Sequence, residues 1–139
     1  MANYYGSARS NYFNVKDEEA FLVEMEKIPG IAVHRSTTDK GFCILSEDAD
    51  SGGWPSAGYD DDSGEEFEID IVNSVYPHLV DDEVAIFMEC GAEKLRYIVG
   101  YAVAVNNQGD MESISLDEIY ELGATLSNKH TNSISRCEY

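Results

Sequence analysis

The sequence predicts an α+β domain whose mostly antiparallel sheet has about four to five strands, with two to three helices packed on it, in the order β-α-β-β-α-β-β-α. Three observations lead to this prediction. Runs of β-branched and aromatic residues are separated by short turns, other segments show helical periodicity with capping residues at their starts, and the 139 residues contain no internal repeat or linker. A chain of this length is near the usual size of one domain, and its 43% hydrophobic content is sufficient for a core.

The domain limits follow from local composition. Residues 1–10 are small and polar with two tyrosines, and we expect them to form a flexible lead-in. Residues 128–139 are polar as well and are expected to be a loosely held tail. We therefore expect a single α+β domain over residues 11–127.

The first third of the domain contains a strand, a helix and a hairpin. Residues 11–15 (NYFNV) alternate as a short strand does, and residues 17–28 have helical apolar spacing with acids in the first turn. The helix is expected to end at Pro29-Gly30. Residues 31–37 and 41–46 are β-rich runs joined by a short polar turn, which indicates a β-hairpin.

The segment that follows is the longest irregular one. Residues 48–64 consist of turn formers and acids apart from Trp54 and Tyr59, and loops of this length in a compact domain are usually functional or mobile. Residues 65–77 fit both periodicities. We expect a helix there, because Ser63 and Glu66 have capping-box spacing.

The sequence of the last third of the domain predicts a long hairpin, an edge strand and a helix. The hairpin consists of residues 84–90 and 94–106, turning at Gly91-Ala92-Glu93, and its apolar stretch Tyr97 to Val105 predicts a strand covered on both faces. The alternative for this stretch is an interface, which leaves a homodimer open. After a turn at 107–110, residues 111–115 are expected to add an edge strand. Residues 115–126 are expected to form a helix capped by Ser115 with Glu118.

The charge of the chain excludes several classes of partner. It carries 27 Asp and Glu against 9 Lys and Arg, a formal net charge of −18. Such a field repels nucleic acid and anionic membranes and attracts basic surfaces, so we expect no direct nucleic-acid or membrane binding. No stretch approaches the ~20 apolar residues of a membrane helix, and a soluble, cytoplasmic protein is expected.

Cysteine and histidine usage predicts neither a metal centre nor a nucleophilic site. The cysteines Cys43, Cys90 and Cys137 are odd in number and form no CxxC pattern, which favours a reducing compartment. Cys43 and Cys90 lie in predicted strands and are expected to be buried, whereas Cys137 is expected to be exposed. The histidines are isolated, and no G-x-S-x-G, H-E-x-x-H or phosphate-binding loop is present. We expect no enzymatic activity and no cofactor.

The stretch GYDDDSGEEFEID, residues 58–70, holds seven carboxylates in thirteen residues and no base. An EF-hand does not fit it: a register from Asp48 places Tyr59 where the bidentate Glu is needed, and one from Asp60 places Glu65 where the Gly is needed. An irregular Ca²⁺ site and an acid–base carboxylate pair near Trp54 remain alternatives. Helix-start acids and surface solubility explain part of the charge, but a net charge magnitude of ~2–8 suffices for the solubility of a small domain.

Mimicry of a polyanion explains the excess. Acids on alternate strand residues fall ~6.6 Å apart, and acids one helical turn apart fall ~5–6 Å apart, close enough to stand for neighbouring phosphates. Trp54 and Tyr59 would serve as aromatic anchors. The predicted partner-binding residues are Asp48, Asp50, Trp54, Tyr59, Asp60, Asp61, Asp62, Glu65, Glu66, Glu68, Asp70, Asp81, Asp82 and Glu83.

Three stretches carry a resemblance to known proteins: SNYFNVKDEEAF, GAEKLRYIVGYAVAVN and SISLDEIYELG. Together they resemble small acidic proteins of phages, plasmids and integrative elements, over residues 10–127. That genetic setting is rich in anti-defence inhibitors, including antirestriction and anti-CRISPR proteins, several of which resemble DNA mimics. The resemblance implies a bacterial host cell and an inhibitor function, and it assigns no residue.

The functional expectation combines charge and resemblance. We expect a non-enzymatic inhibitor from a mobile element that blocks a basic nucleic-acid-binding surface of a host defence complex, such as a CRISPR effector or a restriction enzyme. The alternatives are an immunity or antitoxin-like protein that neutralises a basic toxin, and a Ca²⁺-dependent regulatory domain.

Overall fold

The computed structural model describes residues 4–38, 41–47, 52–93, 97–126 and 130–138. Within them, six strands form one antiparallel sheet: β1 (Tyr4–Ser10), β2 (Ile31–Arg35), β3 (Phe42–Ser46), β6 (Val84–Glu93), β7 (Tyr97–Asn106) and β8 (Met111–Ser115). Their order across the sheet is β2-β3-β1-β6-β7-β8. Two further short strands, β4 (Ala57–Tyr59) and β5 (Glu66–Glu68), form a separate hairpin. The predicted α+β class with a mostly antiparallel sheet is confirmed, but the prediction of four to five strands is too low.

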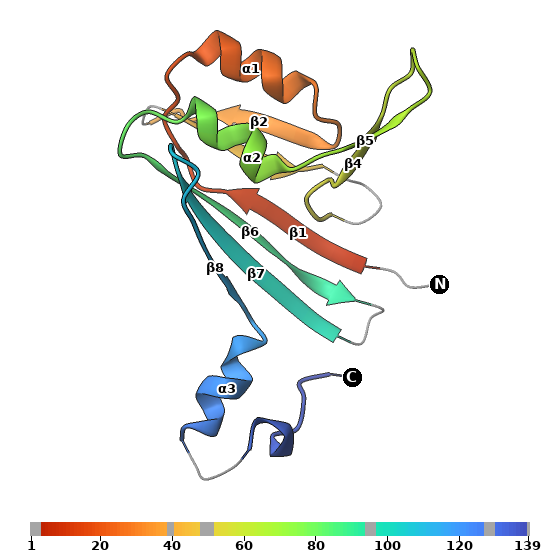
Figure 1. Ribbon diagram of the computed structural model, residues 1–139, viewed down its shortest axis with the longest axis vertical. Helices are drawn as coiled ribbons and strands as arrows, with labels where there is room; N and C mark the ends of the chain where they lie inside the picture. The colour runs from red at the N-terminus through yellow and green to blue at the C-terminus, as the bar shows by residue number, and fades with distance from the viewer. Residues whose placement is uncertain (1–3, 39–40, 48–51, 94–96, 127–129, 139) are drawn as a thin grey trace.

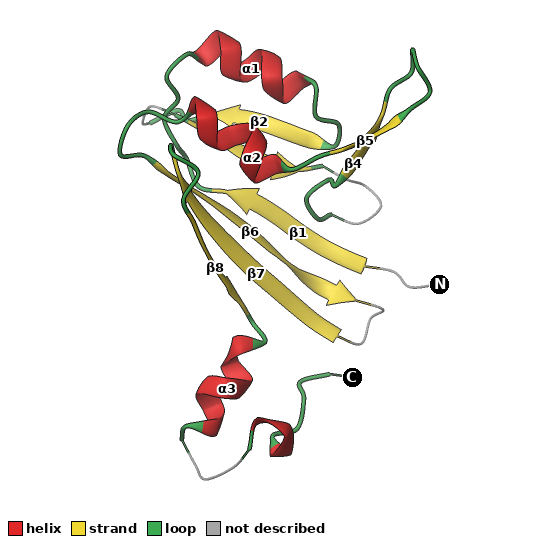
Figure 2. Ribbon diagram, in the orientation of Figure 1, coloured by secondary structure: helices red, strands yellow, loops and turns green. Residues whose placement is uncertain are grey.

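The helices lie at two ends of the sheet. Helices α1 (Glu18–Glu26) and α2 (Ile71–Val75), followed by the 3₁₀ turn η1 (Tyr76–His78), lie over one end, as Figures 1 and 2 show. Helix α3 (Glu118–Ala124) and the 3₁₀ turn η2 (Thr131–Ser133) lie beyond the other end. The helices therefore cover only part of the sheet. No helix among the described residues has the length and apolar character that a membrane crossing requires.

The core forms where α1 and α2 meet the sheet. Phe21 of α1 contacts the ring of Phe13 edge-on at 5.7 Å between centroids and that of Phe42 at 5.3 Å. All three rings are buried. The predicted helix over residues 17–28 is confirmed in α1, whose N-cap is Asp17: its carboxylate accepts a hydrogen bond from the backbone N–H of Ala20 at 3.1 Å.

The N-terminal strand was not predicted. Residues 4–10, expected to lie in a flexible lead-in, form β1 in the middle of the sheet and pair with β6 from Tyr4↔Glu93 to Ser10↔Phe87. The expected strand at 11–15 is absent, and this segment makes only the isolated bridges Phe13↔Phe42 and Val15↔Leu79. The sequence of β1, YYGSARS, carries no alternating apolar signal. Pairing with a distant strand determines its conformation instead.

The predicted helix at 65–77 is wrong in its first half. Glu66–Glu68 forms β5, and α2 begins only at Ile71. The expected cap Ser63 instead accepts a hydrogen bond from the N–H of Glu65, inside the loop of the hairpin. The N-cap is Asp70, whose carboxylate accepts from the backbone N–H of Asn73 at 3.1 Å and from its Nδ2 at 2.7 Å.

Replacing Asp70 with Ala should therefore lower the free energy of unfolding by about 1 kcal/mol, within the ~0.5–2 kcal/mol typical of N-caps. The substitution leaves the first N–H groups of a five-residue helix without their side-chain acceptor. Urea denaturation followed by circular dichroism measures the difference. Asp61→Ala is the matched control, because Asp61 is exposed in the hairpin loop and caps no helix. Equal losses for the two variants would contradict the cap assignment.

The C-terminal third departs from prediction in two details and confirms a third. Gly91 to Glu93, expected to form a turn, continue β6 and pair with β7, from Gly91↔Val99 to Glu93↔Tyr97. Strand β8 confirms the predicted edge strand. Helix α3 begins at Glu118 rather than Ser115, although the Glu118 carboxylate does accept a hydrogen bond from the Ser115 N–H, the reciprocal half of the expected capping box.

The apolar stretch Tyr97 to Val105 is not covered on both faces. Val105 is buried, whereas Ile98 and Tyr101 are 48% and 42% exposed. The polar tail folds back: the Cys137 N–H donates to Tyr120 Oη at 2.7 Å, and the Arg136 guanidinium lies 3.9 Å from the centroid of the Tyr120 ring. Cys43 is buried as expected and Cys137 is exposed as expected, but Cys90 is exposed.

Candidate acidic interaction surface

The acidic stretch forms a hairpin that projects from the body of the domain. Strands β4 and β5 pair in the register Ala57↔Glu68, Gly58↔Phe67 and Tyr59↔Glu66. Figure 1 shows this hairpin extending away from the sheet and the helices, with its loop at the far end. We call residues 57–68 the acidic hairpin. It presents its carboxylates to solvent on a thin, two-stranded support.

Hydrogen bonds within the loop hold the hairpin end in one conformation. The Asp60 carboxylate accepts from the backbone N–H of Asp62 at 2.9 Å and from that of Ser63 at 3.4 Å. The Asp60 N–H donates to the Glu65 carbonyl, and the Gly64 N–H donates to the Asp60 carbonyl, both at 2.8 Å. Gly64 has φ +72°, a left-handed conformation that favours glycine. This is an Asx-type turn, which explains how one acid of the cluster is used locally.

The same hydrogen bonds affect ionisation. The backbone N–H groups of Asp62 and then Ser63 hold the pKa of Asp60 below its usual value, because they stabilise the carboxylate form. Asp60 thus remains charged to lower pH than an unbonded aspartate.

The other hairpin acids are free for a partner. Asp61, Asp62, Glu65, Glu66 and Glu68 are all exposed. The ion pairs of the described residues lie elsewhere, at Lys27–Glu24, Arg35–Glu18 and Arg136–Asp117, so no hairpin carboxylate is neutralised by another described residue. On β5, Glu66 and Glu68 share one face because side chains alternate along a strand.

The two aromatic residues of the predicted surface behave differently. Tyr59 is 66% exposed, and its hydroxyl lies beside Gly64 at the loop. Trp54 is half-buried, and its ring packs edge-on against Phe87 at 5.5 Å between centroids. Its indole N–H is buried and has no acceptor among the described residues. Trp54 therefore packs the segment before the hairpin against the core.

A half-buried carboxylate supports this attachment. The Trp54 backbone N–H donates to Glu89 Oε1 at 2.6 Å, and the Tyr101 hydroxyl lies 3.4 Å from the same oxygen. Burial and the neighbouring Glu89 charge raise the pKa of Tyr101 to about 12, so the phenol stays protonated and can donate. Glu89 thereby links the segment before the hairpin to the central strands.

The remaining predicted acids that the structure describes do not join the acidic hairpin. Asp70 caps α2, and Asp48 and Asp50 lie outside the described residues. The Asp81–Glu83 turn lies on the other side of the molecule in Figure 1, and two of its three acids form hydrogen bonds within the fold. Asp81 accepts from Asn107 Nδ2 at 2.8 Å, and Glu83 accepts from Asn14 N at 2.8 Å. The candidate surface is therefore smaller than predicted: Tyr59, Asp60, Asp61, Asp62, Glu65, Glu66 and Glu68.

No metal centre is evident in the part of the chain that the structure describes: no group of three or more His, Cys, Asp or Glu side chains is arranged to hold an ion. The acidic hairpin spreads its carboxylates outward instead of converging them on a point. That geometry favours contact with an extended positive surface.

The structure also reveals an apolar surface that we did not assign from sequence. Ile119 and Leu122 of α3 are 59% and 62% exposed, next to exposed Ile98, Ile114 and Leu116. A sequence signal was available, because Ile119, Leu122 and Leu126 follow the i, i+3, i+7 spacing of one helix face. That spacing gives a face but does not say whether the chain itself covers it.

Comparisons of the chain with protein-family models, with curated proteins and with solved structures found no match. Functional inference therefore rests on the geometry and chemistry of the two surfaces.

Proposed function

We propose that the protein is a non-enzymatic inhibitor that occupies a basic, nucleic-acid-binding surface of another protein with its acidic hairpin. The observation that carries the proposal is the projection of six exposed carboxylates, at positions 60–62, 65, 66 and 68, on a two-stranded arm with no ion-pair partner among the described residues. An arm of this kind can enter a groove that a flat acidic surface cannot.

The spacing of the charges suits such a groove. Glu66 and Glu68 lie on one face of β5, about 6.6 Å apart, which is roughly two axial phosphate steps of ~3.4 Å along one DNA strand. The loop acids Asp60 to Asp62 extend the row at the end of the arm. The net charge of −18 adds long-range attraction, which accelerates encounter with a basic partner.

The resemblance to anti-defence proteins of mobile elements points to the class of partner: a CRISPR effector or a restriction enzyme of the bacterial host. Such complexes hold nucleic acid in basic channels, and a carboxylate-bearing arm would compete with the phosphate backbone there. A basic toxin would present similar chemistry to the same hairpin, so the identity of the inhibited activity separates these two candidates.

The proposal is tested by reversing charge on the arm. The variant Asp60→Lys/Asp61→Lys/Asp62→Lys should inhibit cleavage by a susceptible CRISPR effector or restriction enzyme at least about tenfold less well than the native chain. Inhibition by the native chain should itself weaken as salt is raised from about 0.05 to 0.5 M, because the contacts are exposed charges. Dose–response curves for DNA cleavage by a panel of these enzymes measure both effects.

The matched control carries the same change of net charge elsewhere: Glu19→Lys/Glu26→Lys/Glu121→Lys, at exposed helix positions. It should retain inhibition. Equal loss in the two variants would show that only net charge matters. Full activity of the hairpin variant would show that the hairpin is not the contact surface. Inactivity of the native chain against the panel, with neutralisation of a basic toxin, would replace the proposed target class by the second candidate.

A further inference from the structure

A second surface of the molecule is apolar and uncovered. Side chains alternate along the paired strands, so Met88, Ala102 and Ile114 share the sheet face opposite to the one that buries Phe87 and Val105. Helices α1 and α2 cover only the Phe87 face. We call the exposed set the outer apolar face; its members are 48% to 67% exposed and are Met88, Ile98, Ile114, Leu116, Ile119 and Leu122.

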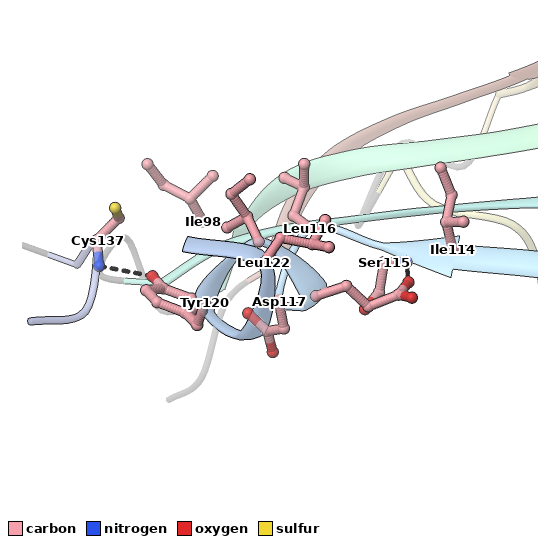
Figure 3. A pocket seen from close by; sticks show the side chains of 10 residues that line it. Ile98, Ile114, Ser115, Leu116, Asp117, Tyr120, Leu122 and Cys137 are labelled. Atoms are coloured by element: carbon pink, nitrogen blue, oxygen red, sulfur yellow. Dashed lines mark hydrogen bonds between the residues drawn. The ribbon is translucent and has the colours of Figure 1, made fainter. Parts of the chain in front are cut away.

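The members of the outer apolar face are contiguous. A groove of about 480 Å³ is lined by Ile98, Ile114, Leu116 and the α3 residues Ile119 and Leu122. A second groove shares Ile114 and Leu116 and extends to Met88. In Figure 3 the side chains of Ile98, Leu116 and Leu122 point to the same side, and that of Asp117 points away from them. These residues thus form one surface across the sheet and α3.

A glycine in β7 allows the loop residue to join this surface. Leu116 follows β8, and its N–H donates to the Gly100 carbonyl at 2.9 Å. A Cβ added at Gly100 would lie 2.9 Å from Leu116 Cδ1, so the leucine side chain lies directly over the glycine. The backbone therefore holds Leu116 on the outer face although β8 has ended.

The exposed area matches that of a specific interface. With roughly 200 Å² for a fully exposed Leu, Ile or Met, the six residues present on the order of 700 Å², against ~300–600 Å² for the largest apolar patch of a typical monomer and ~800 Å² per partner in a standard interface. The outer apolar face alone therefore nearly supplies what a stable dimer buries.

Helix α3 needs a cover that the described chain does not provide. It has seven residues, of which Tyr120 is buried while Ile119 and Leu122 are exposed. Isolated helices shorter than ~12–15 residues are marginal in water and depend on packing of an apolar face. Burial of Ile119 and Leu122 in an interface would supply that packing.

We propose that a second copy of this chain packs on the outer apolar face, forming a twofold-symmetric homodimer. A twofold axis, the commonest symmetry of soluble oligomers, would bring the same apolar residues of the two chains into contact. Two carboxylates at the border of this face are engaged within the chain: Asp117 pairs with Arg136 at 3.6 Å, and Glu118 accepts from the Ser115 N–H.

The arrangement also limits repulsion between two chains of charge −18. The acidic hairpin and the outer apolar face around α3 lie toward opposite ends of the molecule in Figure 1. The dimer would keep the two hairpins apart and accessible, well beyond the Debye length of ~8 Å at physiological ionic strength. If the hairpin acts as proposed above, the dimer would be a bivalent inhibitor. Formation of the dimer does not itself depend on that function.

Sedimentation equilibrium of the native chain tests the dimer directly. The weight-average mass should rise from 15.4 kDa toward twice that value over about 1 to 100 µM. Raising the salt to about 0.5 M should strengthen the dimer by screening like charges, the opposite of its effect on a charge-driven contact. Ile114→Glu and Leu122→Glu should each weaken association at least about tenfold, because the interface would bury an unpaired carboxylate.

Val23→Glu is the matched control, since Val23 is a 54% exposed apolar residue on α1, away from the outer apolar face. It should sediment as the native chain does. Leu122→Glu keeps a good helix former, so it tests the interface even if Ile114→Glu destabilises the edge strand. A native chain that stays at 15.4 kDa at every concentration and salt would overturn the proposal, as would unchanged dimerisation of both variants. Monomers that bind a basic amphipathic peptide through Leu122 would assign the face to a different occupant.

Discussion

Phe21→Ala should lower the free energy of unfolding by about 3–5 kcal/mol, the usual cost of truncating a buried phenylalanine. Phe21 is fully buried, and its ring contacts those of Phe13, Phe42 and His78 at 5.3 to 5.8 Å between centroids. Its removal would leave a cavity where the Phe21 ring now meets three other aromatic rings. Because a domain of this size is stable by only about 5–15 kcal/mol, the variant is expected to be close to unfolding at body temperature.

Urea denaturation monitored by circular dichroism measures the loss, with Val23→Ala as the control. Val23 lies on the same helix but is exposed, and alanine is the better helix former, so this change should alter stability by less than about 0.5 kcal/mol. Similar losses at the two positions would show that α1 does not pack on the sheet through Phe21.

Gly52→Ala should destabilise the protein by about 2 kcal/mol more than Gly64→Ala does. Both glycines are left-handed, with φ +74° and +72°, so alanine meets the same backbone strain at each. Their surroundings differ. A Cβ at Gly52 would overlap the Gly6 carbonyl oxygen and lie 2.7 Å from its carbon, whereas the nearest atom at Gly64 is Tyr59 Oη at 3.4 Å.

The comparison isolates the close approach of the segment before Trp54 to strand β1. Paired denaturation curves for the two variants measure it, and the common strain cancels in the difference. Because Gly52 precedes the residues that attach the acidic hairpin to the core, Gly52→Ala should also displace Trp54 from Phe87, visible as a change in tryptophan fluorescence. Equal stabilities of the two variants would show that this segment does not lie against β1.

Elements with a complete local signal were predictable. Helix α1 has an acidic N-cap, first-turn acids and a buried pair one turn apart, Phe21 and Met25, and its prediction is confirmed. The β2–β3 hairpin and the turn after β7 were likewise indicated by apolar runs separated by turn residues. In these cases the residues that stabilise the element are neighbours in the chain.

Strand β1 and the acidic hairpin lacked such a signal. Residues 4–10 form a strand because they pair with β6, which follows about eighty positions later in the chain. Their own sequence, YYGSARS, shows no alternating apolar pattern. At residues 65–71 two capping sequences competed, Ser63 with Glu66 and Asp70 with Asn73. Because Glu66 is part of β5 and pairs with β4, it cannot lie in the first turn of a helix. The helix α2 therefore begins after the second capping residue, Asp70.

For the candidate site, too, some properties follow from the sequence and others only from the tertiary structure. Composition alone established that the protein is strongly acidic, because net charge is a sum over the chain and does not depend on its fold. Folding determined which acids are available: it placed positions 60–68 on a projecting arm, used Asp70 as a cap and engaged Asp81 and Glu83 in hydrogen bonds. It also left five apolar side chains uncovered, those of Ile98, Ile114, Leu116, Ile119 and Leu122, because whether an apolar residue is buried depends on which distant segment packs against it.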